Sequence, residues 1–141
     1  MKKLQIDAKI DNLNDVISFI DNILDDTNCT FKQRFAIEEA VEEIFVNIAK
    51  YAYPVDGGDA IIEVNTNIDP HYIQIIFIDQ GIQYNPLEKE DPNFNIPLAD
   101  RQIGGLGIYM VKNLMDNIEY EYDNQQNKLT IIKYLGESEN R

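Results

Sequence analysis

Glu43-Ile44-Phe45-Val46-Asn47 is the stretch of this 141-residue chain from which its fold can be worked out. It lies in a run whose apolar residues recur at helical spacing, and residues four apart share one face of a helix. Glu43 and Asn47 would therefore present a carboxylate and a carboxamide side by side to one ligand. Oxygen atoms of these two groups suit a hard, hydrated metal ion.

Two later segments carry complementary chemistry. Asp79-Gln80-Gly81 ends a predicted strand, where a carboxylate can accept a hydrogen bond from the edge of a nucleotide base. Gly104-Gly105-Leu106-Gly107 opens a predicted helix, where backbone N–H groups can approach a phosphate closely. Alone, a glycine cluster also serves tight turns, and an aspartate at a strand end is a common turn former. Together with the acidic helix, the two segments predict an ATP site.

Hydrophobic periodicity outlines the remaining elements. Thr30 followed by Gln33 is the signature of a capping box, and Pro54 should stop the helix that Thr30 begins. The predicted order is a strand over 4–10, helices over 13–24 and 31–53, strands over 60–68 and 72–79, a helix over 106–115, and strands over 118–122 and 128–135.

This order predicts an α+β fold, a two-layer α/β sandwich with a mixed, mostly antiparallel sheet and its helices on one face. The length fits a single domain over residues 1–135, followed by a flexible tail over 136–141. Residues 82–103 contain three prolines and mixed charge, which is too irregular for a regular element. Long ordered loops of this kind are often binding loops, so the segment is predicted to be a lid.

The charge of the chain limits its partners. A formal net charge of -13 and a pI near 4.3 repel nucleic acid and anionic lipid, so neither is an expected partner. A nucleotide would need a divalent cation against this field, which implies Mg²⁺. The start of the chain has no apolar run of the length of a signal peptide or membrane span, and Cys29 is the only cysteine. The expected location is the cytoplasm.

With these motifs in place, residues 31–135 resemble the anti-sigma factor serine/threonine kinases. This family lies within the GHKL group of ATP-binding domains, whose fold is the Bergerat type. Its N-box, Glu-x-x-x-Asn, is matched by residues 43–47. Its first glycine box, Asp-x-Gly, is matched by residues 79–81, and its second, Gly-x-Gly, by residues 105–107 with Gly104 before them.

The resemblance assigns roles to the N-box. Asn47 resembles the ligand that holds Mg²⁺ against the nucleotide phosphates through its carboxamide oxygen. Glu43 resembles the general base, placed to accept a proton from a serine hydroxyl, or to orient water, during attack on the γ-phosphate. Taken alone, each is more often a solvated helix residue. Glu39, one turn earlier, either supports Glu43 or faces solvent.

The resemblance also assigns roles around the base. Asp79 resembles the carboxylate that accepts a hydrogen bond from the adenine amino group, and Gly81 the residue that leaves room for the purine. Thr130 stands where this fold usually places a hydroxyl beside adenine, although threonine is common in strands for propensity alone. Gln83 replaces the second glycine that many relatives carry, which puts base stacking at this turn in question.

The phosphate end of the implied site departs from the family pattern. Gly104, Gly105 and Gly107 would wrap the phosphates, with the positive end of the following helix directed at them. Relatives competent for phosphoryl transfer often place an arginine immediately before this box, and here Ile103 occupies that position. Arg101 is the nearest arginine and is either a phosphate ligand delivered by the lid or a surface residue. Lys50 is a second candidate cation.

Two functions follow as hypotheses. The resemblance implies an anti-sigma regulatory factor that binds Mg-ATP and phosphorylates a serine of an antagonist protein in a partner-switching system, while also binding a sigma factor. The alternative is a non-catalytic module in which nucleotide gates protein binding, and Ile103 motivates it. A fragment of a histidine kinase is disfavoured because no phospho-acceptor helix is predicted. Residues 13–24 serve either a homodimer, as in relatives, or the core.

Overall fold

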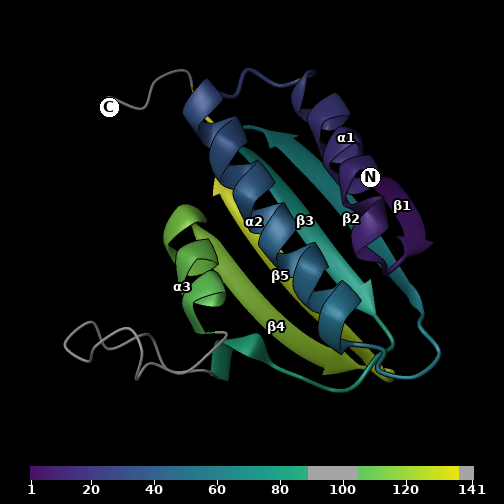
Figure 1. Ribbon diagram of the computed structural model, residues 1–141. Helices are drawn as coiled ribbons and strands as arrows, with labels where there is room; N and C mark the ends of the chain where they lie inside the picture. The colour runs from purple at the N-terminus through teal and green to yellow at the C-terminus, as the bar shows by residue number, and fades with distance from the viewer. Residues whose placement is uncertain (89–104, 137–141) are drawn as a thin grey trace.

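The computed structural model describes residues 1–88 and 105–136, which form a layer of helices packed on one sheet (Figure 1). The strands are β1 (Lys2–Asp7), β2 (Asp59–Ile68), β3 (His71–Asp79), β4 (Asn117–Asp123) and β5 (Gln126–Tyr134). The helices are α1 (Leu13–Leu24), α2 (Phe31–Tyr51) and α3 (Gly105–Leu114), with short 3₁₀ turns η1 (Ile10–Asn12) and η2 (Pro86–Glu88). The predicted two-layer α+β sandwich is confirmed.

The strand order of the sheet is β1-β2-β3-β5-β4. All four pairs of neighbouring strands among the described strands are antiparallel. The described sheet is thus wholly antiparallel, whereas a mixed, mostly antiparallel sheet was predicted. β3 and β5 are neighbours although α3 and β4 lie between them in the sequence. Their register sets Asp79 opposite Asn127, which joins the end of β3 to the start of β5.

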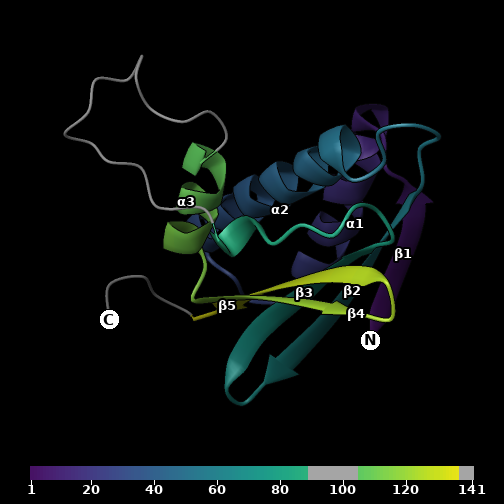
Figure 2. The same ribbon diagram turned by 90° about the horizontal axis from the view of Figure 1, so that it is seen from below.

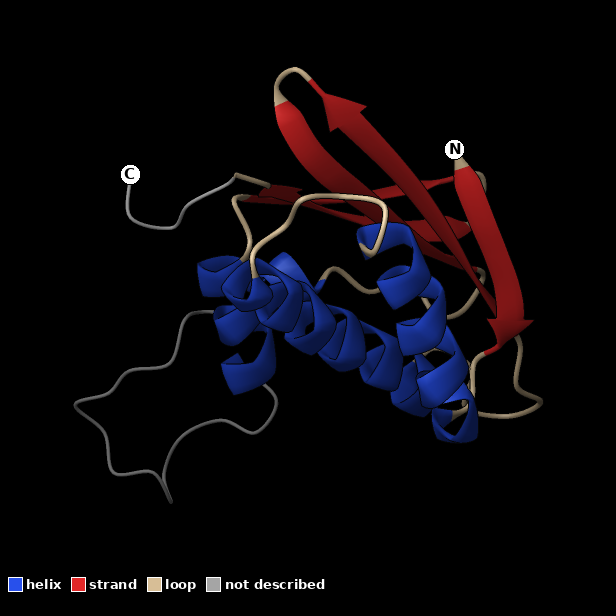
Figure 3. Ribbon diagram, turned by 90° about the horizontal axis from the view of Figure 1, so that it is seen from above, coloured by secondary structure: helices blue, strands red, loops and turns tan. Residues whose placement is uncertain are grey.

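The three α-helices cover the same face of the sheet, and the other face carries none of the described helices (Figure 3). Strand residues alternate between these faces, so every second side chain of β2, β3 and β5 enters the core. The largest fully buried side chains come from both layers, and include Phe45, Ile37 and Val41 of α2 and Phe77, Ile75 and Ile131 of the sheet. This packing holds α2 firmly across the sheet.

α2 begins as its sequence predicts and ends slightly earlier. The Thr30 hydroxyl accepts a hydrogen bond from the Gln33 backbone N–H at 3.0 Å, and the Gln33 side chain accepts one from Thr30 N–H at 2.9 Å. The helix stops at Tyr51, with Ala52 as its C-cap, and not at residue 53. Pro54 explains the difference because a residue before proline avoids the helical region.

The β4–β5 hairpin is tighter than its sequence suggests. Asn124 and Gln125 have positive φ angles of 52° and 62°, as a two-residue type I′ turn requires. β5 therefore begins at Gln126, two residues before the predicted start, and Asn127 belongs to the strand. The polar run from Asn124 to Asn127 conceals this, because the same residue types also make longer turns.

The chain that follows β3 runs between α2 and the β4–β5 hairpin and reaches η2 beside α3 (Figure 2). Ile82 N–H donates to the Ala52 carbonyl at 2.9 Å, which ties this chain to the end of α2. Residues 81–88 are therefore a strap across one end of the two layers. The rest of the predicted lid, and the glycine at 104, lie outside the described residues.

Candidate functional site

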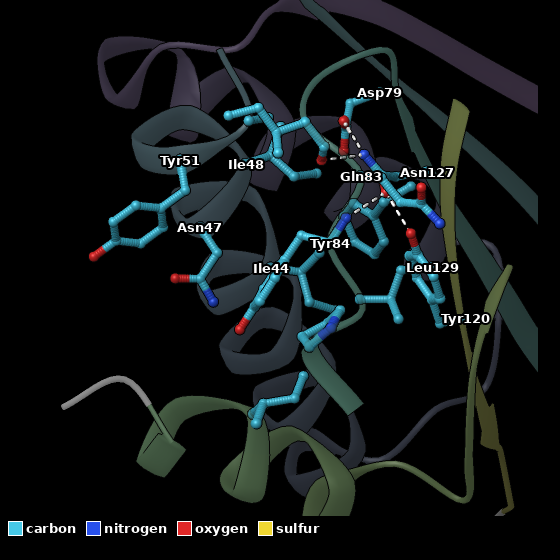
Figure 4. A pocket seen from close by; sticks show the side chains of 15 residues that line it. Ile44, Asn47, Ile48, Tyr51, Asp79, Gln83, Tyr84, Tyr120, Asn127 and Leu129 are labelled. Carbon is cyan, nitrogen blue, oxygen red and sulfur yellow. Dashed lines mark hydrogen bonds between the residues drawn. The ribbon is translucent and has the colours of Figure 1, made fainter. Parts of the chain in front are cut away.

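A cavity of about 510 Å³ opens between the two layers at the strapped end (Figure 4). Ile44, Ile48, Phe77, Ile108 and Leu129 give it apolar walls. Its polar side chains include Asn47 of α2, Asp79 of β3 and Asn127 of β5. A concave, mostly apolar space with a few placed polar groups is the usual form of a small-molecule site.

Glu43 and Asn47 lie side by side on α2, as their spacing predicts. Asn47 Nδ2 donates a hydrogen bond to Glu43 Oε1 at 3.3 Å. Asn47 lines the cavity, whereas Glu43 lies one turn earlier in the helix, against the start of α3. A Cβ atom on Gly107 would overlap the Glu43 carboxylate, so the absence of a side chain at Gly107 is what allows α3 to approach here.

Asp79 ends β3 and is only 7% exposed. Its Oδ1 atom accepts hydrogen bonds from Gly81 N–H and from Asn127 Nδ2, each at 2.9 Å. Burial raises the pKa of Asp79, and the two hydrogen bonds partly oppose that rise. Both hydrogen bonds use Oδ1, which leaves Oδ2 as the carboxylate oxygen for a ligand in the cavity.

Gly81 has a different role from the one expected. A Cβ atom at this position would overlap the Ala52 carbonyl oxygen, and Gly81 is not among the residues that line the cavity. The missing side chain makes room for the end of α2 and not for a purine. Gly81 therefore shapes the site indirectly, because it lets the strap cross the helix closely enough for Ile82 to bond to Ala52.

Thr130 lies away from the cavity. It lines a separate hollow on the uncovered face of the sheet with residues such as Glu63, Glu119 and Lys128. The neighbouring residue Leu129 lines the cavity instead. Because side chains alternate along a strand, a shift of one residue moves a side chain to the opposite face. The expectation that the Thr130 hydroxyl lies beside adenine is therefore wrong in this structure.

Lys50 is exposed on the last turn of α2 and does not line the cavity, whereas the next residue, Tyr51, does. The structure thus does not bring Lys50 to the site. Arg101 and Gly104 lie outside the described residues, and Gly105 is the first residue of α3. The predicted phosphate-binding end is described only from Gly105 onward.

Asn127 is the site residue that the sequence analysis missed. It is 7% exposed, and its Nδ2 donates to Asp79 Oδ1 and to the Ile82 carbonyl, each at 2.9 Å. Its Oδ1 accepts from Tyr84 N–H at 3.1 Å and from the Tyr120 hydroxyl. The sequence could have indicated it only through the position of the hairpin turn. With the turn at Asn124 and Gln125, Asn127 belongs to β5 and pairs with Asp79.

Comparisons with known proteins place this site in a family. A family model described as a histidine kinase-like ATPase domain matches residues 6–133. The chain belongs to this family. Membership of this family implies that the protein binds ATP. The apolar walls fit a flat nucleotide base. The Asp79 carboxylate and the Asn47 amide, both at the cavity surface, fit the polar edge of the base and the phosphates.

The chain is similar to several named kinases. It is 21% identical to the serine/threonine-protein kinase BtrW of Bordetella bronchiseptica over 93% of this chain and 92% of that one. It is 30% identical to the serine-protein kinase RsbW of Bacillus mycoides over 68% of this chain and 61% of that relative's length. The solved structure of the RsbU and RsbW domains of Rv1364c from Mycobacterium tuberculosis matches with a TM-score of 0.67 at 16% identity, covering 96% of this chain and 33% of that one.

Two further findings concern the described residues alone. None of their helices is long and apolar enough to cross a membrane. Residues 1–88 and 105–136 also contain no group of three or more His, Cys, Asp or Glu side chains arranged to hold a metal ion. A Mg²⁺ ion at Asn47 would then need phosphate oxygens and water for most of its ligands, which is how Mg²⁺ is commonly held beside nucleotides.

Proposed function

We propose that this protein is an ATP-dependent serine/threonine protein kinase and anti-sigma regulatory factor. It transfers the γ-phosphate of ATP to a serine of an antagonist protein in a partner-switching system, and also binds a sigma factor. The observation that carries the proposal is the placement of Asp79 and Asn47 in one cavity, with Glu43 one helical turn from Asn47. The similarity to the protein kinases BtrW and RsbW supports the choice of protein kinase.

In this proposal Asp79 binds the base and Asn47 faces the phosphates. Asp79 Oδ2 accepts a hydrogen bond from the adenine amino group, while Ile44, Phe77 and Leu129 exclude water from the purine. The Asn47 carboxamide oxygen is a ligand of Mg²⁺, which when bound neutralises phosphate charge. The start of α3 lies beside the Glu43 carboxylate at Gly107, and backbone N–H groups at a helix start can bind phosphate.

Glu43 is the proposed general base. Its carboxylate accepts the proton of the substrate serine hydroxyl as the serine oxygen bonds to the γ-phosphorus. The bond from that phosphorus to the bridging oxygen breaks, and ADP leaves with this oxygen. Only Oε1 of Glu43 bonds to Asn47, at the long Nδ2–Oε1 distance of 3.3 Å, which leaves Oε2 to accept the proton of the serine.

Transfer of labelled γ-phosphate to an antagonist domain tests the proposal. Glu43→Gln keeps the shape of the side chain and removes its basicity, so phosphoryl transfer should fall by about 10²-fold or more, while ATP affinity changes little. Glu42→Gln, on an exposed position of the same helix, is the matched control and should retain transfer. Full transfer by Glu43→Gln would remove Glu43 from the role of base.

The non-catalytic alternative has its own support. Glu43 already contacts Asn47 and the start of α3, and Ile103 stands where transfer-competent relatives often carry arginine. Under this alternative ATP binds in a Mg²⁺-dependent way and changes affinity for a protein partner, and no phosphorylated product forms. Calorimetry with a partner protein, followed by mass spectrometry of that partner, separates the two functions.

A further inference from the structure

Asn127 uses its full hydrogen-bonding capacity within the structure. A side-chain amide has two N–H donors and an oxygen that accepts two bonds. Both donors are used, by Asp79 Oδ1 and the Ile82 carbonyl, and both acceptor positions are used, by Tyr84 N–H and the Tyr120 hydroxyl. A flipped amide would direct its oxygen at the Asp79 carboxylate and the Ile82 carbonyl, so these partners determine its orientation.

These contacts join parts of the site that are distant in sequence. Asp79 ends β3, Ile82 and Tyr84 belong to the strap, and Tyr120 lies on β4 (Figure 4). Asn127 is therefore the one described side chain that bonds to Asp79 and to the strap at once. Removing its amide would leave Tyr84 N–H without this acceptor and would leave the Asp79 carboxylate held by Gly81 N–H alone.

The location of these bonds on Asp79 determines what a ligand meets. Gly81 and Asn127 both bond to Oδ1, and this arrangement leaves Oδ2 as the oxygen available to a ligand. Building on the ATP site proposed above, we infer that Asn127 is a positioning residue for base recognition. It fixes Asp79 and the strap relative to each other, and so makes binding selective for purines with an amino group at position 6.

A pair of ligands tests this inference directly. ATP and purine riboside 5′-triphosphate differ in the 6-amino group that Asp79 would bind. Titration calorimetry with Mg²⁺ should show the native protein binding ATP about tenfold more tightly or better, as expected for a hydrogen bond to a charged group. In Asn127→Leu this ratio should fall toward one, since Asp79 keeps only its bond from Gly81 N–H and loses its tie to the strap. If the substitution only lowered the stability of the protein, the affinities for both triphosphates would fall equally and their ratio would not change.

Asn65→Leu is the matched control. Asn65, like Asn127, is a strand asparagine whose amide donates to another side chain, here Gln74 Oε1 at 3.1 Å. It is half-buried and does not line the cavity. The control should keep the native ratio of the two affinities. If Asn65→Leu and Asn127→Leu lower the ratio equally, the effect is not specific to Asn127 and the inference is overturned.

Asn127→Asp supplies a second test through pH. In the native protein, ATP selectivity should fall as pH falls through the raised pKa of Asp79, because a protonated Asp79 no longer accepts from the amino group. In Asn127→Asp, a single proton shared with Asp79 replaces the lost donor, and the pair separates when that proton leaves. Selectivity should then fall as pH rises, opposite to the native profile.

Few other ionisable groups face this carboxyl pair among the described residues. Tyr53, beyond the end of α2, and Tyr120 on β4 both interact electrostatically with Asp79. Burial raises the pKa of each tyrosine, so both stay neutral over the pH range of the test. Asp59 on β2 interacts electrostatically with Tyr53, and Tyr122 on β4 and Glu88 on η2 interact with Tyr120.

The outcomes separate this inference from the function on which it rests. If the native protein does not bind ATP, the proposed function fails. If it binds ATP and both Asn127 variants keep the native selectivity and native pH profile, the ATP site stands and the inference is overturned. If Asn127→Leu does not fold, the direction of the pH profile of Asn127→Asp decides between support and refutation.

Discussion

Glu38 of α2 faces Asp21 of α1, where the two helices pack together. A hydrogen bond to Asp21 and burial raise the pKa of Glu38 to about 7, and Arg34 opposes this rise. Arg34 also bonds to Asp21 at 3.2 Å and to Asp25 at 2.8 Å. Glu38 therefore keeps its proton at mildly acidic pH and shares it with Asp21, while Arg34 balances the remaining negative charge.

This pair predicts how stability changes with pH. The pKa of Glu38 is higher in the folded protein than its ordinary value of 4.5, so its contribution is complete below 4.5 and is lost as pH rises toward about 7. Thermal unfolding should show a stability loss between these values, and Glu38→Gln should reduce that loss. Asp79 acts in the same direction, so the difference between variant and native protein isolates Glu38.

Glu42→Gln on the same helix is the control and should leave the pH profile unchanged. Glu42 is exposed on the same helix. A profile for Glu38→Gln that matches the native one would mean that Glu38 does not share a proton with Asp21.

Contacts between elements depend on two glycines whose surroundings differ. At Gly81 an added Cβ would meet backbone, the Ala52 carbonyl oxygen, which cannot move without shifting the end of α2. Gly81→Ala should therefore lower the free energy of unfolding by about 1–3 kcal/mol, as overpacking does. Denaturant titration measures this loss, and an unchanged midpoint would show that the strap does not approach α2 this closely.

Gly107 provides the matched comparison. An added Cβ there would meet the far end of the flexible Glu43 side chain, which can turn aside. Gly107→Ala should cost less stability than Gly81→Ala but should displace the Glu43 carboxylate, so phosphoryl transfer should fall by about tenfold or more. Transfer at the native rate would indicate that the position of Glu43 against α3 is not needed for activity.

Local chemistry made some of these elements predictable. Thr30 with Gln33 predicted the start of α2, and helical periodicity predicted that Glu43 and Asn47 share a face. Strand register was harder, because it depends on a two-residue turn with positive φ angles that a polar run does not reveal. That difference explains why Asn127 was missed. Thr130 was assigned from the family resemblance, which does not resolve a shift of one residue along the strand.

Charge is the property of the whole molecule that matters most for an anionic ligand. The chain has a formal net charge of -13, so ATP approaches a protein that repels it at long range. The cavity is lined mainly by apolar side chains, and Asp79 adds a carboxylate to its lining. Favourable binding then depends on local donors and on a cation that neutralises the phosphates, in agreement with the Mg²⁺ role proposed for Asn47.

This argument predicts a linked dependence of stability on ATP and Mg²⁺. A ligand that binds only the folded state at 100 times its Kd stabilises that state by about 2.7 kcal/mol. ATP with MgCl₂ should therefore raise the midpoint of thermal unfolding, whereas ATP with EDTA should raise it much less. MgCl₂ alone should have a small effect, because the described residues form no metal site of three or more ionisable side chains.

Asn47→Ala separates the metal from the base in the same measurement. It removes the proposed Mg²⁺ ligand while the Asp79 carboxylate and its two hydrogen bonds remain. The additional stabilisation by Mg²⁺ should then shrink, and the smaller shift with ATP and EDTA should persist. If the variant keeps the full Mg²⁺-dependent shift, the phosphates lie elsewhere than beside Asn47, and the assignment of this end of the cavity to the triphosphate fails.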